Sequence, residues 1–203
     1  MHGIALVEQV LESVRQDPGR SMFDHRNVPW VTGEPTPLPT MPEFPSGRPL
    51  SPSLQAWLAY DRSLFTRHGW FADDGTLTPR PLDELVTDEL GWWGECFTPI
   101  ADRFPECFLL PGGSDSRRVL AVGEPDSMGE YPILAIDVDD LPFAGLMYPG
   151  FDIYAAHTAN LLDLSFPTYT ALATHPTYAS RMQEHSTHHF SGTLSYEHLF
   201  QPS

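Results

Sequence analysis

The segment YPILAIDVDDLPFAG, residues 131–145, decides the fold that we expect for this chain. It begins as an apolar run with strand character and ends in three acids, Asp137, Asp139 and Asp140. Two further short apolar runs come before it: CFLLPGG at 107–113 and RRVLAVGE at 117–124. Short apolar runs that Gly, Pro and Asp separate are typical of an antiparallel meander. We therefore predict that these three runs form the centre of an antiparallel sheet.

Helical patterns come before this meander. The spacing of apolar residues predicts helices over residues 4–16, from Pro52 onward and over 81–97. The apolar face of the first helix is expected to consist of Ile4, Val7, Val10, Leu11 and Val14. Between the first two helices, residues 29–50 are so rich in proline that we predict an extended arm. The arm is expected to run over the surface of its own domain, and the alternative is a ligand for an SH3-type domain.

Helical patterns also follow the meander. The segment LMYPGFDIY (146–154) adds one or two strands, and helices are expected over 155–166 and from Pro167 onward. Helices, then strands, then helices indicate an α+β fold with a mostly antiparallel sheet of four to six strands. The predicted parts of this single domain are an N-terminal helix (1–28), the proline-rich arm (29–50), an α+β core (51–166) and a C-terminal helical extension (167–203).

The charge of the chain restricts its partners. The formal net charge is −16, and lysine is absent from the 203 residues. Nucleic acids and anionic membranes attract positive charge, so we expect neither as a partner. A basic protein remains compatible, because an acidic surface would speed its association. We expect a cytoplasmic protein with reduced Cys96 and Cys107, because the N-terminus lacks the pattern of a signal peptide.

Three segments resemble the SMI1/KNR4, or SUKH, superfamily. The segment LSPSLQAWLAYDRSLF (50–65) resembles the family's opening helix, and FLLPGGSDSRRVLAVGEPDSMGEYPILAIDVDD (108–140) resembles its central strands. The segment FDIYAAHTANLLDL (151–164) is similar to the return from strand to helix that ends the domain. The likeness covers roughly residues 48–165 and contains no catalytic string. It implies a protein that binds another protein without catalysis or cofactor; bacterial members are largely immunity proteins that neutralise toxins, often nucleases.

The acids of the central segment are candidates for a partner-binding surface. Asp137 and Asp139 share one face of a strand, because side chains alternate along it. The spacing after Asp137 does not match an EF-hand calcium loop, since Leu141 and Pro142 occupy its fifth and sixth positions. The remaining alternatives are a solvated strand end and an acidic rim that contacts a basic partner. The candidate partner-binding residues are Asp115, Glu124, Asp126, Glu130, Asp137, Asp139, Asp140 and Trp92.

Other candidate motifs are weaker. His185 and His189 have the i, i+4 spacing that can bind zinc, but a third ligand such as His175 or His198 would have to come from elsewhere. The segment LPGGSD (110–115) lacks the pattern of a phosphate-binding loop, so it is interpreted as a turn.

Trp92 and Trp93 are neighbours on one predicted helix, so one of the two is expected to be partly exposed. An exposed tryptophan beside acids could anchor an interface, and the alternative is that both tryptophans pack in the core.

We therefore expect a toxin-neutralising immunity protein that is a monomer or weak homodimer, without metal or cofactor. The alternatives are a regulatory interaction module that is unrelated to toxins and, less favoured, a metal-dependent enzyme.

Overall fold

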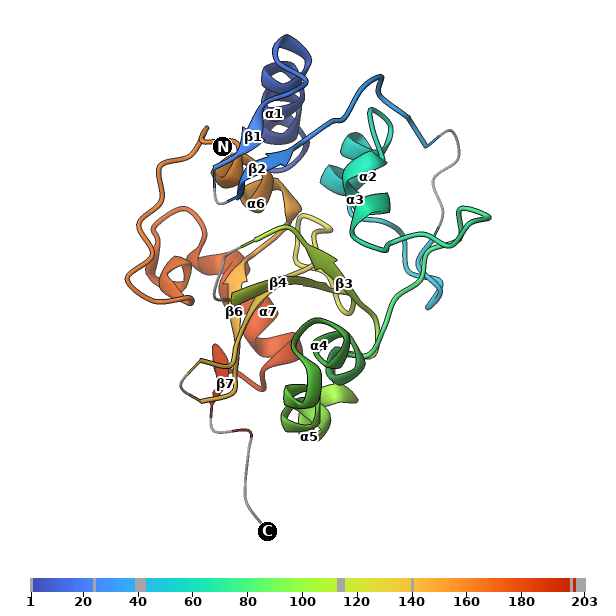
Figure 1. The fold of residues 1–203 in the computed structure, drawn as a ribbon. Coiled ribbons are helices and arrows are strands. Elements are labelled where there is room, and N and C mark those ends of the chain that lie inside the picture. The colour runs from blue at the N-terminus through green and yellow to red at the C-terminus, as the bar shows by residue number, and fades with distance from the viewer. Residues whose placement is uncertain are drawn as a thin grey trace.

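A five-stranded antiparallel sheet forms the centre of the molecule (Figure 1). The computed structural model describes residues 2–23, 25–38, 43–112, 116–139, 141–197 and 199. The strands follow one another in sequence order: β3 (Cys107–Leu110), β4 (Ser116–Ala121), β5 (Ile133–Asp137), β6 (Phe143–Tyr148) and β7 (Ser195–Glu197). Register partners include Leu109 with Val119 and Val119 with Leu134. The predicted α+β fold and its antiparallel meander are confirmed.

Helices surround the sheet and bury it. They are α1 (Ile4–Gln16), α2 (Pro52–Leu58), α3 (Ser63–Arg67), α4 (Leu82–Leu90), α5 (Thr98–Ala101), α6 (Phe151–Thr158) and α7 (Ala179–His189), with 3-10 helices η1 (Gly91–Phe97) and η2 (Ala171–Thr174). Strands β1 (Ser21–Met22) and β2 (His25–Pro29) form a separate two-stranded sheet. Helix α4 packs on β3, and α6 and α7 pack on β6. The runs Val119–Ala121 and Ile133–Ile136 are fully buried, as is usual for strands that are covered on both faces.

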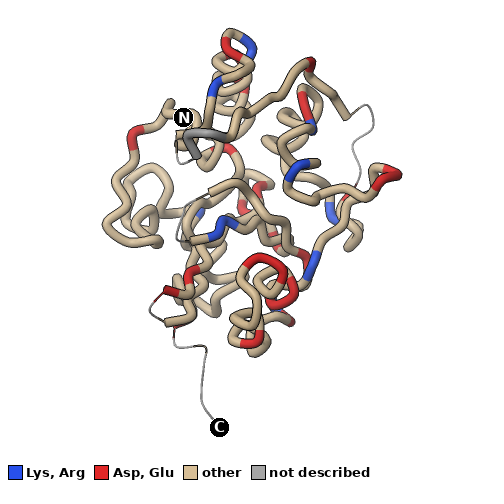
Figure 2. The backbone as a smooth tube through the Cα atoms, in the orientation of Figure 1, with Lys and Arg blue, Asp and Glu red and all other residues tan. Residues whose placement is uncertain are grey.

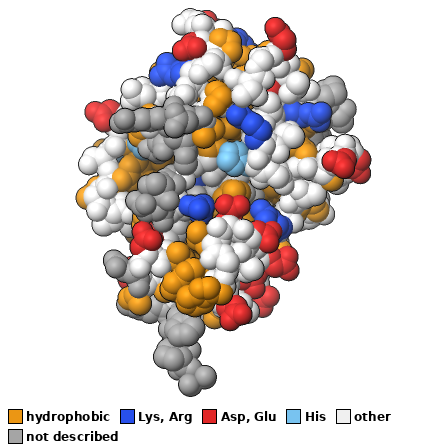
Figure 3. Space-filling view, in the orientation of Figure 1, with side chains coloured by type: hydrophobic (Ala, Val, Ile, Leu, Met, Phe, Trp, Pro, Cys, Tyr) orange, Lys and Arg blue, Asp and Glu red, His pale blue; other side chains and the backbone are white. Residues whose placement is uncertain are grey.

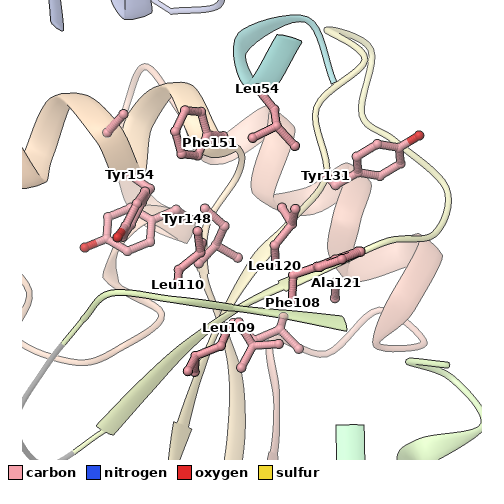
Figure 4. Packing of buried hydrophobic residues seen from close by; sticks show 14 of the residues in the cluster. Leu54, Phe108, Leu109, Leu110, Leu120, Ala121, Tyr131, Tyr148, Phe151 and Tyr154 are labelled. Carbon is pink, nitrogen blue, oxygen red and sulfur yellow. The ribbon is translucent and has the colours of Figure 1, made fainter. Parts of the chain in front are cut away.

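The hydrophobic core joins the sheet to α2 and α6. Figure 4 shows Leu54, Phe151 and Tyr154 from these helices gathered over Leu120 and Tyr148 of the sheet. All five side chains are fully buried. Burial of such large apolar side chains is the main favourable contribution to folding.

The N-terminal helix is part of this domain, because α1 packs against α2 and α6. Its apolar face differs from the prediction at one position. Ile4 is 47% exposed, and Leu6 is buried in its place with 2% exposed. The predicted positions 7, 10, 11 and 14 are buried. The first turn therefore faces its neighbours at a slightly different angle from the rest of the apolar stripe.

The proline-rich arm packs on its own domain, as expected. Trp30, Val31, Phe44 and Leu50 are buried, and the backbone N–H of Leu38 donates to the carbonyl of Leu58 over 2.9 Å. Residues 39–42 lie outside the described residues.

Three predicted helices end earlier or begin later than the sequence pattern indicated. The helix over 81–97 changes to a 3-10 helix at Gly91, which has a φ of 68°. The helix predicted over 155–166 spans Phe151–Thr158 instead, because Asn160 takes a left-handed backbone conformation with a φ of 59°. The last long helix begins only at Ala179, after Pro176. Ser195–Glu197, in the predicted helical extension, forms the edge strand β7. Within the described part of the chain, no helix is long and apolar enough to cross a membrane.

Candidate functional site

The predicted acidic rim is wrong for two of its members, Asp126 and Glu130. They are 5% and 0% exposed, so neither can contact a partner. The turn that carries them folds inward, and the Asp126 carboxylate accepts hydrogen bonds from the backbone N–H groups of Met128 and Glu130 at 2.8 and 3.0 Å. Sequence reasoning placed these acids on an exposed turn because acids are usually exposed. Their partners come from distant segments, which the local pattern does not contain.

Arg181 is the partner that explains the burial of Asp126. Its Nε donates to Asp126 Oδ2 at 2.5 Å, and its Nη1 donates to Asp152 Oδ2 at 2.9 Å. The backbone N–H of Gly3 donates to the same Asp152 oxygen at 2.6 Å. Burial alone would raise the pKa of Asp126, but the contacts with His185 and Arg181 outweigh it and lower that pKa. This cluster joins α1, α6 and α7 inside the molecule.

Glu130 lies beside this cluster, but its pKa is raised, whereas that of Asp126 is lowered. Burial and the nearby Asp152 raise its pKa to about 7, although Ser53 donates to it through its backbone N–H and its hydroxyl. The distances of these two hydrogen bonds are 2.9 and 2.5 Å. The site is a structural contact between the 123–130 turn and the start of α2.

The remaining predicted acids do not form one described surface. Glu124 is exposed and pairs with Arg48 at 3.2 Å. Asp137 is half-buried and accepts a hydrogen bond from the Tyr169 hydroxyl at 2.5 Å, whereas Asp139 is exposed. Asp115 and Asp140 lie outside the described residues. Only Glu124, Asp137 and Asp139 are therefore described acids of the predicted set that solvent can reach.

Trp92, a predicted partner-binding residue, is largely exposed in the structure. It is 63% exposed and stacks on Trp93 with ring centroids 4.0 Å apart. Acidic side chains of α4 and η1 lie in the same part of the molecule, and Figure 2 shows red residues gathered on the α4 coil. A shallow cavity of about 280 Å³ is lined by Asp83, Glu84, Thr87, Asp88, Gly94, Glu95 and Thr98. We call Trp92, Trp93, Asp83, Glu84, Asp88 and Glu95 the tryptophan–acid surface.

Gly94 holds η1 against α4 within this surface. A Cβ at position 94 would lie 1.8 Å from Thr87 Oγ1 and 2.5 Å from the backbone oxygen of Asp83. Only a glycine permits this close approach of η1, which carries both tryptophans, to α4, which carries three of the acids. The sequence analysis identified Trp92 but missed these acids. Their alternation with apolar residues along 82–90 was the available signal for an exposed acidic face.

A second cavity of about 630 Å³ carries arginines in this otherwise acidic protein. Figure 3 shows blue side chains and a histidine around a hollow in the middle of the visible face. Arg80 pairs with Asp88, and Arg117 pairs with Glu89 at 3.5 Å. Arg67 donates to the carbonyl oxygen of Pro29 at 2.7 Å. Most of the positive charge here is therefore already balanced by acids of α4.

A third cavity, of about 580 Å³, has aromatic walls. Its lining includes Arg118, Phe143, Met147, His157, Phe166, Tyr169 and Glu197. A smaller cavity of about 230 Å³ adjoins it and contains Asp137 and Asp139; the two share Phe143, Tyr169 and Glu197. Sequence reasoning missed this cavity, because its walls come from β4, β6, β7 and the loop before η2.

His185 and His189 have a structural role, because each lies within hydrogen-bond distance of a backbone carbonyl oxygen. His185 Nε2 lies 2.9 Å from the carbonyl oxygen of Pro149, and His189 Nε2 lies 2.9 Å from that of Glu124. Burial lowers the pKa of His189 to about 4. Among the described residues, which exclude His198, no group of three or more His, Cys, Asp or Glu residues is placed to hold a metal. Cys96 and Cys107 are buried free thiols, and burial raises the pKa of Cys107.

Comparison with known proteins supports the fold alone. No family model and no curated protein matches the sequence. A crystal structure of an uncharacterized protein from Salmonella enterica serovar typhimurium is similar, with a TM-score of 0.59 and 16% sequence identity. The alignment covers 95% of this chain and 94% of that one. The two proteins share a single-domain α+β architecture.

Proposed function

We propose that this protein is an immunity protein of the SMI1/KNR4 type, which binds and neutralises a basic toxin through the tryptophan–acid surface. One observation carries the proposal: Trp92 is largely exposed, stacks on Trp93 and belongs to η1, which packs against the acid-bearing helix α4. An exposed tryptophan is suited to anchor an interface, because tryptophan is a frequent energetic centre of interfaces.

The acids of this surface determine its specificity for a basic partner. Asp83 and Glu84 lie in the first turn of α4, and Glu95 lines the same shallow cavity, whereas Asp88, which also lines it, is already paired with Arg80. Figure 3 shows hydrophobic side chains next to red ones over this part of the molecule. Such charges mainly raise the association rate with a basic protein and select against acidic ones, whereas the buried aromatic contact supplies affinity.

The first test is to search the genomic neighbourhood of this gene for a toxin-like reading frame and to co-express it with this protein. We expect growth to be rescued and a complex to be recovered by size-exclusion chromatography. Trp92→Ala should weaken binding by about 2 kcal/mol or more, roughly 30-fold, because it removes the central aromatic contact. Failure to rescue growth together with the absence of a complex would contradict the proposed function.

Two charge-reversal double variants distinguish the effect of this surface on association from the effect of the net charge. Glu84→Arg with Glu95→Arg should slow association about tenfold at low salt, with a smaller effect at high salt. Glu8→Arg with Glu12→Arg changes the net charge equally on the exposed face of α1 and should leave the rate much closer to that of the wild type. If growth is rescued but both pairs behave alike, the function stands and the partner surface is elsewhere.

A regulatory module unrelated to toxins would use the same surface and differ in its partner. The described part of the proline-rich arm offers such a module little as a scaffold, because Trp30, Val31, Leu38, Phe44 and Leu50 are buried in their own domain.

A further inference from the structure

Two consecutive arginines on β4 lie in different cavities. Side chains alternate between the faces of a sheet, so neighbours on one strand point to opposite sides. Arg117 lines the cavity of about 630 Å³ and pairs with Glu89 there. Arg118 lines the aromatic cavity of about 580 Å³ and is only 6% exposed. The two residues thus offer the same charge in two different environments.

Arg118 lacks a counter-ion within the described part of the chain. Its Nη1 donates to Ser116 Oγ at 2.5 Å, and its guanidinium carbon lies 5.7 Å from the centroid of the Tyr169 ring. Its Nε is buried without a hydrogen-bond acceptor among the described residues. None of their carboxylates lies within 4.0 Å of its nitrogen atoms. Arginines this deeply buried are normally paired, because an unpaired buried charge is costly.

Asp137, a candidate partner on the neighbouring strand, is already engaged. Asp137 pairs in register with Ser116, one strand away from Arg118. One of its carboxylate oxygens accepts the Tyr169 hydroxyl, and the other accepts the backbone N–H of Asp139 at 3.0 Å. Tyr169 therefore stands between the two charges: its hydroxyl holds Asp137 and its ring covers the guanidinium.

The rest of the cavity is apolar and aromatic. Phe143 and Tyr169 lie with ring centroids 5.4 Å apart, and Phe166 packs edge to face on Tyr148 at 5.5 Å. Met147 adds a flexible side chain that can adapt to a ligand. A volume of this size is in the range of small-molecule sites, in which apolar walls surround a few polar groups. Exposed Glu197 also lines the cavity and would repel a second negative charge.

We propose that this cavity binds a small monocarboxylate with an apolar body of aromatic size. The carboxylate pairs with Arg118, and the body packs among Phe143, Phe166 and Met147. Arginine suits this role because its planar guanidinium donates two parallel hydrogen bonds to a carboxylate. The cavity shares no residue with the tryptophan–acid surface, so ligand binding here is independent of the proposed partner.

The test is isothermal titration of the purified full chain with 3-phenylpropionate. Its amide, 3-phenylpropanamide, has the same shape without the charge and should bind at least about tenfold more weakly. Arg118→Met should weaken binding of the carboxylate by about tenfold or more while leaving the amide little changed. Arg117→Met is the matched control, since it removes the neighbouring arginine from the other cavity and should not alter the affinity.

Three outcomes would overturn the proposal. These are no binding of the carboxylate up to about 10 mM, equal affinity for the amide, or equal losses in the two arginine variants. If Arg118→Met does not fold, the comparison of carboxylate and amide on the wild-type protein still decides whether a negative charge is recognised. Phe166→Ala then reports whether the bound molecule occupies the aromatic cavity, because it should weaken both ligands.

Discussion

At the scale of single residues, two buried groups make folding sensitive to pH in opposite directions. Glu130 has a pKa of about 7 in the folded protein, above the ordinary value of 4.5, because it is buried near Asp152. Between these values the folded state keeps a proton that the unfolded state releases, so stability falls as the pH rises. His189, with a pKa of about 4 instead of 6.5, is buried in its neutral form. Its contribution is lost as the pH falls from about 6.5 to 4.

Glu130→Gln should make visible the pH dependence that His189 gives to the free energy of unfolding. In the wild type the two effects oppose each other between about pH 4.5 and 6.5, which flattens the stability profile. As the pH rises from 5 to 8, the free energy of unfolding of the variant should increase by roughly 2 to 3 kcal/mol relative to that of the wild type. Urea unfolding at four pH values across this range measures the change. Glu8→Gln, on the exposed face of α1, is the control, and a Glu130→Gln profile parallel to the wild type would contradict the assignment.

At the scale of elements, the contact between α4 and η1 depends on the lack of a side chain at Gly94. The chain changes from an α-helix to a 3-10 helix at Gly91, which brings Gly94 against Thr87. Thr87 in turn donates its hydroxyl to the backbone oxygen of Asp83 at 2.8 Å. This contact fixes η1, which carries Trp92, against the acid-bearing helix α4, so the proposed interface depends on the packing of these two elements.

Gly94→Ala should therefore cost about 2 to 3 kcal/mol of stability and disturb the stacked tryptophans, because the new methyl group meets backbone as well as side chain. Gly91→Ala is the comparison, since a Cβ there meets no atom within 4 Å and only the left-handed backbone is strained. We expect it to cost about 1 to 3 kcal/mol through backbone strain while leaving the tryptophan stack intact. Urea unfolding gives both values, and near-ultraviolet circular dichroism reports the tryptophan pair. An unchanged near-ultraviolet spectrum in Gly94→Ala with little loss of stability would show that η1 can shift away from α4.

At the scale of the whole molecule, both ends of the described chain are built into the domain. Helix α1 packs on α2 and α6, and Gly3 donates to the buried Asp152. Near the other end, β7 adds the last strand to the sheet, and Arg103 Nη1 donates to the hydroxyl of Tyr196 at 2.6 Å. The buried pairs of Arg181 tie these regions together. One cooperative unfolding transition is the expected behaviour of such a domain.

A pair of substitutions in α1 tests this integration. Leu6→Ala should destabilise the entire protein by about 2 to 5 kcal/mol, because Leu6 is buried against the rest of the domain. Ile4→Ala, two residues earlier and 47% exposed, should cost less than about 1 kcal/mol. Thermal unfolding that is followed by tryptophan fluorescence measures both, since α1 itself contains no tryptophan. If Leu6→Ala leaves the tryptophan transition unchanged, α1 unfolds independently of the domain.

The sequence by itself determined the α+β class, the order of β3 to β5 and the inner positions of α1 at 7, 10, 11 and 14; the strands expected within 146–154 are instead the end of β6 and the start of α6. These features follow from short-range patterns: apolar runs between turn residues, and apolar spacing along a helix. Local reasoning also named Trp92 as a candidate exposed residue, because neighbouring residues on a helix lie about 100° apart, but it left open that both tryptophans pack in the core.

Only the tertiary structure decided which charged side chains are buried and what they contact. Asp126 and Glu130 resembled exposed turn acids until Arg181, 55 residues away from Asp126, and Ser53, 77 residues away from Glu130, proved to be their partners. Arg118 likewise reads as an ordinary strand residue, and its missing counter-ion becomes visible only once the cavity walls are assembled. Burial and pairing of charge depend on contacts between distant segments, so no local pattern contains them.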